Sequence, residues 1–238
     1  MKKDVDQAPD PAEIAREAAR AGRGLIRDLD PDQARRLAEY ITLLLKWNRS
    51  MNLVGRVSWN GIMADLVMDS LHLADFLAGL SAELSAGLGL PASPRCLDFG
   101  AGAGLPGIPL RLVWTPGTYL LVETRERRAA FLRTAVGLVL PGGRTRVFAG
   151  RVENLPPEEL PADLILSRAF APWPEYLALA RPLLAPGGMA LVMTSGPPPS
   201  PEELAAKAPG YVLTASKAYP APGGERYFWG LAPASISR

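Results

Sequence analysis

The sequence predicts an α/β fold built on a mostly parallel seven-stranded sheet, with a helical N-terminal extension. From residue 95 onward, short apolar segments of strand length alternate with segments of helical spacing, which is the pattern of a parallel sheet. A glycine-rich run, Leu97 to Gly107, joins the first of these strands to the first helix. With 238 residues and 48% hydrophobic content, the chain can bury a core of ordinary size.

The first 90 residues are expected to form two parts. Residues 1–29 alternate charges with alanine and glycine, and we expect a poorly defined segment with one helix at most. Residues 30–90 are expected to form the helical extension, because Asp30, Pro31 and Gln33 have the pattern of a capping box with proline at the first helical position. Apolar side chains at helical spacing predict a first helix that ends near Arg49, with Leu37, Ile41 and Leu44 on one side. They also predict a second helical segment, whose apolar side chains are Ile62, Leu66, Leu73, Leu77 and Leu80.

A linker rich in glycine and proline, residues 81–94, leads into the sheet domain, residues 91–238. Residues 186–188 are expected to turn into a strand, and the proline-rich residues 196–201 to form a surface loop. The expected strands are 95–99, 118–123, 144–149, 163–167, 189–194, 211–216 and 225–231, and the expected helices of the domain are 107–114, 126–138 and 174–185. The last two strands are expected to pair as a terminal hairpin, and the other five to run parallel.

The glycine-rich run has the features of a loop that binds a nucleotide cofactor. Gly100, Gly102 and Gly104 have no Cβ, so their backbone can turn sharply and bring N–H groups against a ligand at the start of the following helix. Loops between strand and helix are where α/β sheets bind such ligands. Because Gly102, Gly104 and Gly107 also fit the dinucleotide pattern G-x-G-x-x-G, the glycines alone do not identify the cofactor.

Two carboxylates strengthen this interpretation. Glu123 closes the second apolar strand and follows Gly104 by about 20 residues, the separation expected for an acid that accepts hydrogen bonds from both ribose hydroxyls. Asp98 precedes Gly100 by two residues, and we expect it either to hold the loop through N–H groups or to assist the cationic end of the ligand. The alternative for both residues is an ordinary solvated acid at a strand end.

Composition excludes several classes of protein. The longest apolar runs fall short of the roughly 18 residues of a membrane span, and the N-terminus lacks an apolar signal core, so we expect a cytoplasmic protein. Cys96 is the only cysteine, which leaves no disulfide framework and no cysteine cluster for a metal. The net charge of +2 does not by itself indicate nucleic acid, but residues 111–151 hold eight arginines against two glutamates. This segment would attract phosphate if the arginines converge; the alternative is a solvated surface.

Taken in order, the segments resemble the RsmG (GidB) family of bacterial 16S rRNA methyltransferases over roughly residues 37–230. The matching motifs are LKWNRSMNL at 45–53, DSL at 69–71, LDFGAGAGLPGIPL at 97–110, RR at 127–128 with FLR at 131–133, RVE at 151–153, SRAF at 167–170, PGG at 186–188 and ER at 225–226. The resemblance implies a Rossmann-like class I S-adenosylmethionine-dependent methyltransferase fold. It also implies S-adenosylmethionine as the cofactor, 16S rRNA in the 30S subunit as the partner, and N7 of a guanine in the decoding-centre loop as the methyl acceptor.

By this resemblance, Glu123 binds the cofactor ribose, and Val152 and Glu153 flank the adenine. Together with the loop residues, the cofactor-binding set is Asp98, Gly100, Gly102, Gly104, Leu105, Glu123, Val152, Glu153 and Arg168. Arg168 is placed between cofactor and substrate, and we assign it the catalytic role. Because arginine stays protonated and offers a rigid fork of donors, it would hold RNA phosphate or a guanine edge and would not act as an acid or base.

The implied reaction is an in-line displacement at about 3 to 3.5 Å, and guanine N7 carries no proton, so no general base is required. The residues predicted to contact RNA are Arg127, Arg128, Arg144, Arg146, Phe170 and Trp173. The four arginines would contact the backbone, and Phe170 or Trp173 would stack on an extruded base. The alternative for the two aromatic side chains is packing within a loop. We expect no metal and favour a monomer.

Two positions depart from the family pattern. The family usually has histidine where this chain has Leu66 and lysine where it has Thr194, and the only histidine, His72, receives no role. These departures concern substrate and activity, not cofactor binding. They leave two alternatives open: a relative that binds without catalysis, and a methyltransferase for another RNA or a small molecule. A third alternative, a nicotinamide dehydrogenase, rests on the pattern of Gly102, Gly104 and Gly107, and the lack of an evident proton-transfer group disfavours it.

Overall fold

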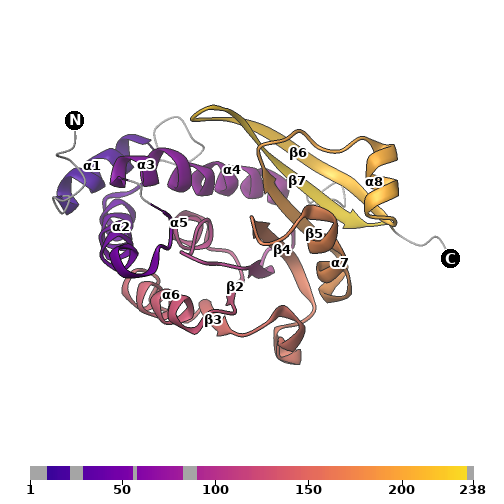
Figure 1. The fold of residues 1–238 in the computed structure, drawn as a ribbon, viewed down its shortest axis with the longest axis horizontal. Coiled ribbons are helices and arrows are strands. Elements are labelled where there is room, and N and C mark those ends of the chain that lie inside the picture. Colours follow the sequence, from indigo (N-terminus) through magenta and orange to yellow (C-terminus); the bar gives the residue numbers. More distant parts are fainter. Residues whose placement is uncertain (1–9, 22–28, 56–57, 83–89, 235–238) are drawn as a thin grey trace.

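A computed structural model describes residues 10–21, 29–55, 58–82 and 90–234. Within them, a central sheet lies between two layers of helices (Figure 1). The seven strands run in the order β3-β2-β1-β4-β5-β7-β6. Their bounds are β1 Arg95–Phe99, β2 Thr118–Glu123, β3 Thr145–Ala149, β4 Ala162–Arg168, β5 Leu184–Thr194, β6 Tyr211–Ala221 and β7 Gly224–Pro233.

Strands β1 to β5 are parallel, and β7 is antiparallel to both β5 and β6. The predicted mostly parallel sheet with a terminal hairpin is confirmed. The strand order changes direction between β1 and β4, because β2 and β3 continue on one side of β1 and β4 and β5 on the other. In parallel α/β sheets, ligands bind at the carboxyl ends of the strands beside such a switch point.

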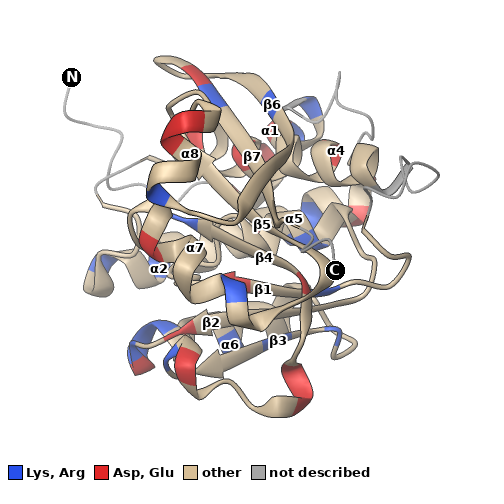
Figure 2. Ribbon diagram, turned by 90° about the vertical axis from the view of Figure 1, so that its right-hand side faces the viewer, with Lys and Arg blue, Asp and Glu red and all other residues tan. Residues whose placement is uncertain are grey.

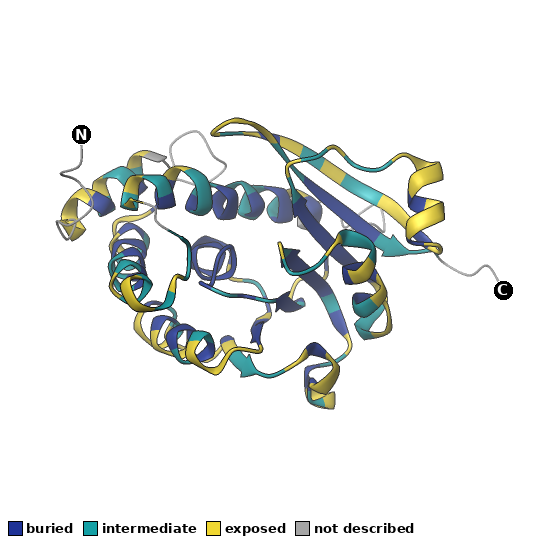
Figure 3. Cartoon of the chain, in the orientation of Figure 1, coloured by how far each residue is buried: buried dark blue, intermediate teal, exposed yellow. Residues whose placement is uncertain are grey.

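The alternation of side chains along the strands divides the interior into two cores. On β1, Cys96 faces the core that contains Ile108 and Phe131, whereas Leu97 and Phe99 face the other core. The first core lies under α1, α2, α4, α5 and α6, and the second lies under α7 and α8. Figure 3 shows the buried side of these helices turned toward the sheet. Both faces of the sheet are therefore covered, as a parallel sheet requires.

The helices are α1 Pro11–Ala21, α2 Pro31–Met51, α3 Trp59–Gly61, the π-helical segment η1 Ile62–Val67, α4 Met68–Ala82, α5 Gly107–Val113, α6 Glu126–Val139, α7 Trp173–Ala180 and α8 Pro201–Lys207; short 3₁₀ turns are η3 Val152–Asn154, η4 Pro157–Glu159 and η5 Arg181–Leu183. The predicted capping box at the start of α2 is present: the Gln33 N–H donates to Asp30 Oδ1 at 2.8 Å, and the Asp30 N–H donates to Gln33 Oε1 at 3.0 Å. None of the described helices is both long and apolar enough to cross a membrane.

The extension is fixed to the sheet domain along α2. Near its start, the Gln33 side-chain amide donates to the Leu112 carbonyl at the end of α5, over 2.9 Å. Farther along, the Trp47 ring lies 5.7 Å from the Phe131 ring of α6. Because α2 spans 21 residues, it reaches from one end of the sheet toward the other.

Two sequence predictions need correction, and one helix was not predicted. The helix expected at 174–185 ends at Ala180, and β5 already begins at Leu184, so residues 186–188 lie in a strand that shifts register against β4 and do not form a turn before it. Helix α8 was not predicted. Its start carries a Ser200 cap whose hydroxyl accepts the Glu203 N–H at 3.2 Å, a signal hidden by the preceding prolines. The predicted linker at 81–94 lies partly outside the described residues, as do parts of the segment 1–29.

Candidate cofactor and substrate site

The carboxyl ends of the parallel strands bring most of the predicted site residues to one edge of the sheet. The glycine loop follows β1, Glu123 ends β2, and Arg168 ends β4. Val152 and Glu153 follow β3 in a short 3₁₀ turn. Thr194 ends β5. This edge is the one expected to bind a ligand in a parallel sheet.

The glycine loop adopts backbone angles that suit glycine. Gly100, Gly102 and Gly104 have φ values of +69°, +55° and +79°. A Cβ added at Gly102 would meet only the Gly100 carbonyl oxygen at 3.6 Å and the Arg128 Nη1 at 3.8 Å, so a ligand can approach this backbone closely. Gly107 has a different role: a Cβ there would lie 2.6 Å from Asp98 Oδ2, because Gly107 packs against β1 as the first residue of α5. Within the loop, positive φ values thus occur at the first three glycines, whereas Gly107 allows α5 to pack closely against the sheet.

Glu123 lies beside the open glycine. Its Oε2 accepts the Gly102 N–H at 3.0 Å, its Oε1 accepts the Arg125 N–H at 2.8 Å, and the residue is 5% exposed. A carboxylate offers about four lone-pair positions, so each oxygen keeps one for a further donor. The two backbone bonds fix the carboxylate next to the loop, which is the arrangement needed to accept two hydroxyl groups of one sugar.

Asp98 lies beneath the loop. It is 1% exposed, on the face of β1 that packs against α5, and its Oδ2 accepts the Tyr119 hydroxyl at 3.1 Å. Burial raises the pKa of Asp98 to about 7, although the Tyr119 hydrogen bond and the positive charge of Arg168 act in the opposite direction. The partner of its carboxylate in the structure is thus the Tyr119 hydroxyl and not a loop N–H group.

Sequence reasoning missed one contact that holds the loop. The Tyr40 hydroxyl of α2 donates to the Ala103 carbonyl at 2.7 Å, and Tyr40 is fully buried. Burial raises the pKa of Tyr40, so the hydroxyl remains a donor. The N-terminal extension therefore supports the loop directly. The signal available in the sequence was only a tyrosine on the apolar face of α2.

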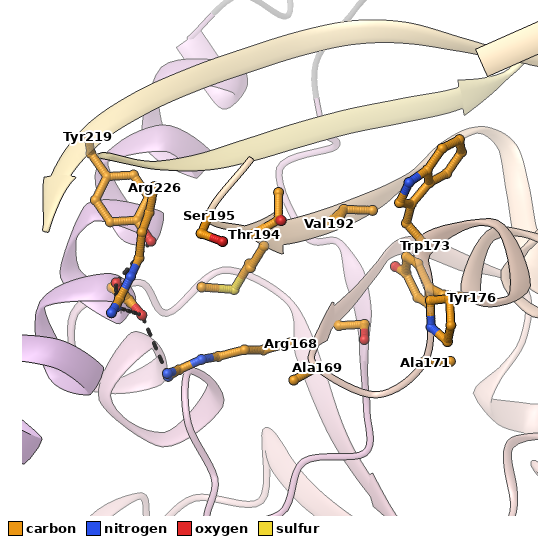
Figure 4. A pocket seen from close by; sticks show the side chains of 14 residues that line it. Arg168, Ala169, Ala171, Trp173, Tyr176, Val192, Thr194, Ser195, Tyr219 and Arg226 are labelled. Atoms are coloured by element: carbon orange, nitrogen blue, oxygen red, sulfur yellow. Dashed lines mark hydrogen bonds and ion pairs between the residues drawn. The ribbon is translucent and has the colours of Figure 1, made fainter. Parts of the chain in front are cut away.

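A pocket of about 470 Å³ adjoins the end of β4 (Figure 4). The side chains that line it include Arg168, Trp173, Thr194, Ser195, Tyr219 and Arg226. Arg168 is 24% exposed at its side chain and reaches across the pocket toward α4, and Trp173 lies on the opposite side (Figure 4). The pocket thus combines cationic donors, hydroxyl groups and an aromatic wall, a composition suited to a nucleobase with its phosphate.

The two aromatic candidates differ in position. The Phe170 ring covers Gly100, since a Cβ there would lie 2.7 Å from Phe170 Cδ2, and it packs against Phe99 with centroids 5.8 Å apart. Trp173 lines the pocket and meets Trp229 edge-on at 6.2 Å. Between Arg168 and Phe170, Ala169 has a positive φ of 54°, which turns the chain out of β4.

The four predicted RNA-binding arginines do not gather at one place. Arg127 is exposed and Arg128 half-buried in the first turn of α6, at the carboxyl end of β2; Figure 2 shows basic ribbon at this end of α6. Arg146 is paired with the buried Glu159, with Nη1–Oε1 and Nη2–Oε2 distances of 2.7 and 2.8 Å. Arg144 precedes β3 and therefore lies at the opposite edge of the sheet.

Asp69 and Arg226 belong to motifs that carried no predicted role. Asp69 of α4 is 3% exposed and contacts Arg226, Tyr219 and Arg168. Of the two positions that depart from the family pattern, Leu66 packs against the first core, and Thr194 lines the pocket with its Oγ1 accepting the Gly196 N–H at 3.3 Å. Among the described residues, no group of three or more His, Cys, Asp or Glu side chains is placed to hold a metal ion.

Comparison with known proteins gives concordant matches. A family model, GidB, described as rRNA small subunit methyltransferase G, matches residues 33–209. The chain is 47% identical over 206 residues to "Ribosomal RNA small subunit methyltransferase G" of Nitratidesulfovibrio vulgaris, covering 85% of this chain and 87% of the relative. It is 39% identical over 208 residues to the protein of the same name from Oleidesulfovibrio alaskensis, with the same coverage.

The fold has a counterpart among solved structures. A point mutant of MtNAS in complex with S-adenosylmethionine superposes with a TM-score of 0.54, covering 95% of this chain and 93% of that one at 14% identity. This likeness concerns the fold alone. It agrees with the predicted Rossmann-like class I methyltransferase architecture.

Proposed function

The chain belongs to the GidB family, rRNA small subunit methyltransferase G, and we propose that it transfers a methyl group from S-adenosylmethionine to N7 of a guanine in 16S rRNA. The observation that carries this proposal is the position of Arg168. It ends the strand next to the glycine loop and lines a pocket with an aromatic wall, so a base in the pocket would lie beside a ligand on the loop.

The residues on the loop side fit the cofactor. The open backbone at Gly102 leaves room for a ligand, and the fixed Glu123 carboxylate retains acceptor positions for the ribose hydroxyls. Val152 is buried next to this edge, while Glu153 is exposed and paired with Arg151 at 3.2 Å. We therefore assign ribose binding to Glu123 and an apolar contact with the adenine to Val152.

When bound, S-adenosylmethionine supplies an electrophilic methyl group. Guanine N7 has an unshared electron pair and no proton, so the chain needs no general base for its methylation. What the protein must provide is position, since holding two reactants in line accounts for a large part of such rate enhancements. The absence of a histidine at Leu66 is therefore compatible with catalysis.

Arg168 is proposed to hold the substrate at the reacting position. A guanidinium presents a planar set of donors, which match a phosphate or the O6 side of a guanine. Its side chain lines the pocket and remains partly exposed, so donors are available to a ligand. Trp173 is proposed to stack on the base, because it forms the opposite wall (Figure 4). Phe170 is proposed to cover the loop, since its ring lies on Gly100.

The rRNA backbone is proposed to cross the edge of the sheet near Arg127 and Arg128. These two side chains lie at the start of α6, on the same edge as the pocket. Phosphate contacts of this kind contribute RNA affinity that decreases as the salt concentration rises. The 30S subunit is retained as the partner because the family resemblance implies it. The cytoplasm as the location and a monomer as the working state are retained as expectations.

The test is transfer of labelled methyl from S-adenosylmethionine to 30S subunits and to protein-free 16S rRNA that lack the modification, with the product nucleoside identified and mapped. We expect N7-methylguanosine at one position in the decoding-centre loop. If the protein binds S-adenosylmethionine but labels another nucleotide, the assigned acceptor is wrong. If it binds the cofactor and labels neither substrate, the proposed reaction fails, and Leu66 and Thr194 become the first positions to restore to histidine and lysine.

A further inference from the structure

A buried carboxylate joins the N-terminal extension to the pocket. Asp69 lies on α4, yet its partners come from the terminal hairpin and from β4. The Tyr219 hydroxyl donates to Asp69 Oδ1 at 2.9 Å, and Arg226 Nη1 donates to Oδ1 and Oδ2 at 2.8 and 2.7 Å. Arg168 Nη1 lies 3.6 Å from Oδ2. The Asp69 carboxylate thus contacts residues that lie about 100 to 157 positions away from it in the sequence.

The two arginines are held differently. Arg226 makes hydrogen bonds to Asp69 and two further contacts to Asp65, one to the carbonyl oxygen at 2.8 Å and one to Oδ1 at 3.1 Å. Its donors are therefore largely used within the protein. The 3.6 Å between Arg168 and Asp69 is an ion-pair distance without a hydrogen bond. The Asp69 carboxylate therefore attracts the Arg168 guanidinium toward one position, while the N–H donors of Arg168 stay free for a ligand (Figure 4).

We propose that Asp69 is a positioning residue for methyl transfer: its carboxylate, fixed by Arg226 and Tyr219, holds the Arg168 guanidinium in the pocket where the substrate base and phosphate bind. The proposal rests on the function proposed above. It makes the N-terminal extension a working part of the active site. No bond to Asp69 forms or breaks in the reaction.

The negative charge, and not only the shape of Asp69, is required. Both Arg226 and Arg168 approach the same oxygen, at 2.7 and 3.6 Å. Without the charge, two guanidinium groups would face each other with no carboxylate charge between them, and their repulsion would turn the less restrained one away. Arg168 is that group, because Arg226 keeps its contacts to Asp65. An isosteric amide should therefore misplace Arg168 while the chain stays folded.

The first experiment is a double-mutant cycle on methyl transfer, with Asp69→Asn and Arg168→Ala alone and combined. In the unaltered background, Asp69→Asn should lower the limiting transfer rate roughly 10- to 100-fold, the cost of a misplaced reacting group. Cofactor affinity should change less than about threefold. In the Arg168→Ala background the same change should have almost no further effect, because the residue on which Asp69 acts is gone. If the fold losses in rate of the two single variants multiply in the double variant, the proposal is wrong.

Asp65→Asn is the matched control, because Asp65 contacts Arg226 but not Arg168. It should cost less than about threefold, as expected for a partly exposed ion pair. An equal loss in both variants would mean that Asp69 only anchors the hairpin. If Asp69→Asn does not fold, Tyr219→Phe removes one hydrogen bond from the carboxylate, and its smaller loss should likewise vanish in the Arg168→Ala background.

A second measurement needs no RNA and so separates this inference from the proposed function. An arginine-specific dicarbonyl reagent modifies accessible guanidinium groups, and mass spectrometry gives the rate at Arg168. Asp69→Asn should raise that rate several-fold, whereas Asp65→Asn should leave it unchanged. Equal rates in the unaltered protein and Asp69→Asn would show that the carboxylate does not hold Arg168, whatever the outcome of the methyl-transfer assay.

Discussion

The two halves of the candidate site differ in the groups that form them: one consists mainly of backbone groups and the other of side chains. The loop half, Leu97 to Arg125, consists mainly of backbone groups, with Glu123 accepting two backbone N–H groups from within this segment. The Arg168 half consists of side chains from α4, β4, α7, β5, β6 and β7, and its central contact joins Asp69 to a residue 157 positions away. A backbone site is encoded by local sequence, whereas a side-chain site is encoded by the complete fold.

This contrast predicts that substitutions in the two halves change different kinetic properties. Damage to the loop half should weaken cofactor binding and leave the rate at saturation nearly intact. Damage to the Arg168 half should lower the rate and leave cofactor binding nearly intact. The substitutions below test that division, beginning with the largest expected effect.

Arg168→Ala should lower the limiting rate of methyl transfer by about 10²- to 10³-fold, the usual cost of removing a donor that acts in the transition state. The expected change in the dissociation constant of S-adenosylmethionine is less than about fivefold. Calorimetric titration and single-turnover transfer measure the two quantities. Arg181→Ala is the control, because Arg181 lies outside the pocket and donates to the Pro209 carbonyl. A fully active Arg168 variant would remove the residue from the mechanism.

Asp98 belongs to the loop half but is a buried side chain, so its effect should be on stability. Its pKa is about 7 in the folded protein because of burial, against about 4 in an unfolded chain. Between these values the folded chain keeps a proton that the unfolded chain has lost, so the contribution of Asp98 to stability falls as the pH rises from 4 to 7 and is constant above that. Relative to Asp98→Asn, the free energy of unfolding should fall by about 2 kcal/mol over this window, less than the full linkage value because the site relaxes around the charge.

Urea unfolding of both proteins at pH 4.5, 6 and 8 gives this difference, and the other titrating groups cancel because both proteins contain them. A difference that is constant with pH would show that Asp98 ionises normally and is not desolvated as the structure indicates.

Glu123→Ala should weaken S-adenosylmethionine binding by about 10- to 100-fold, corresponding to the loss of two charge-assisted hydrogen bonds. Glu126→Ala is the matched control: it removes an exposed carboxylate three residues away whose partner is Arg133 at 2.8 Å. The control should stay within about twofold. Unchanged affinity in Glu123→Ala would end the ribose assignment.

The smallest expected effect separates two arginines. Arg127→Ala, at the edge of the pocket, should weaken RNA binding a few-fold and reduce the slope of log K against log salt by about one. Arg144→Ala, at the opposite edge, should change neither quantity. Filter-binding titrations at several salt concentrations compare the pair. If both variants lose affinity alike, the RNA contacts both ends of the sheet.

The same contrast explains how much of this molecule could be predicted from its sequence. The seven strands, the capping box of α2 and the glycine loop were predictable, because each depends on neighbouring residues and regular periods. Helix α8 was hidden by prolines that resemble a loop. Tyr40 on the loop and Tyr219 and Arg226 on Asp69 could not be derived from spacing, since nothing in a single sequence reports which distant side chains the fold brings together. Arg144 shows the converse: it is near Arg127 and Arg128 along the chain, but it precedes β3 and so lies at the opposite ends of the strands from the pocket.

The most direct test of the division is the rate of methyl transfer to 30S subunits as a function of S-adenosylmethionine concentration, for the unaltered protein, Glu123→Ala and Arg168→Ala. We expect the Glu123→Ala curve to be displaced to higher concentration but to approach the unaltered plateau. The Arg168→Ala curve should keep its midpoint and have a plateau lower by about two orders of magnitude or more. If the two variants share one pattern, with midpoint and plateau changed together, the site does not have separate cofactor and substrate halves.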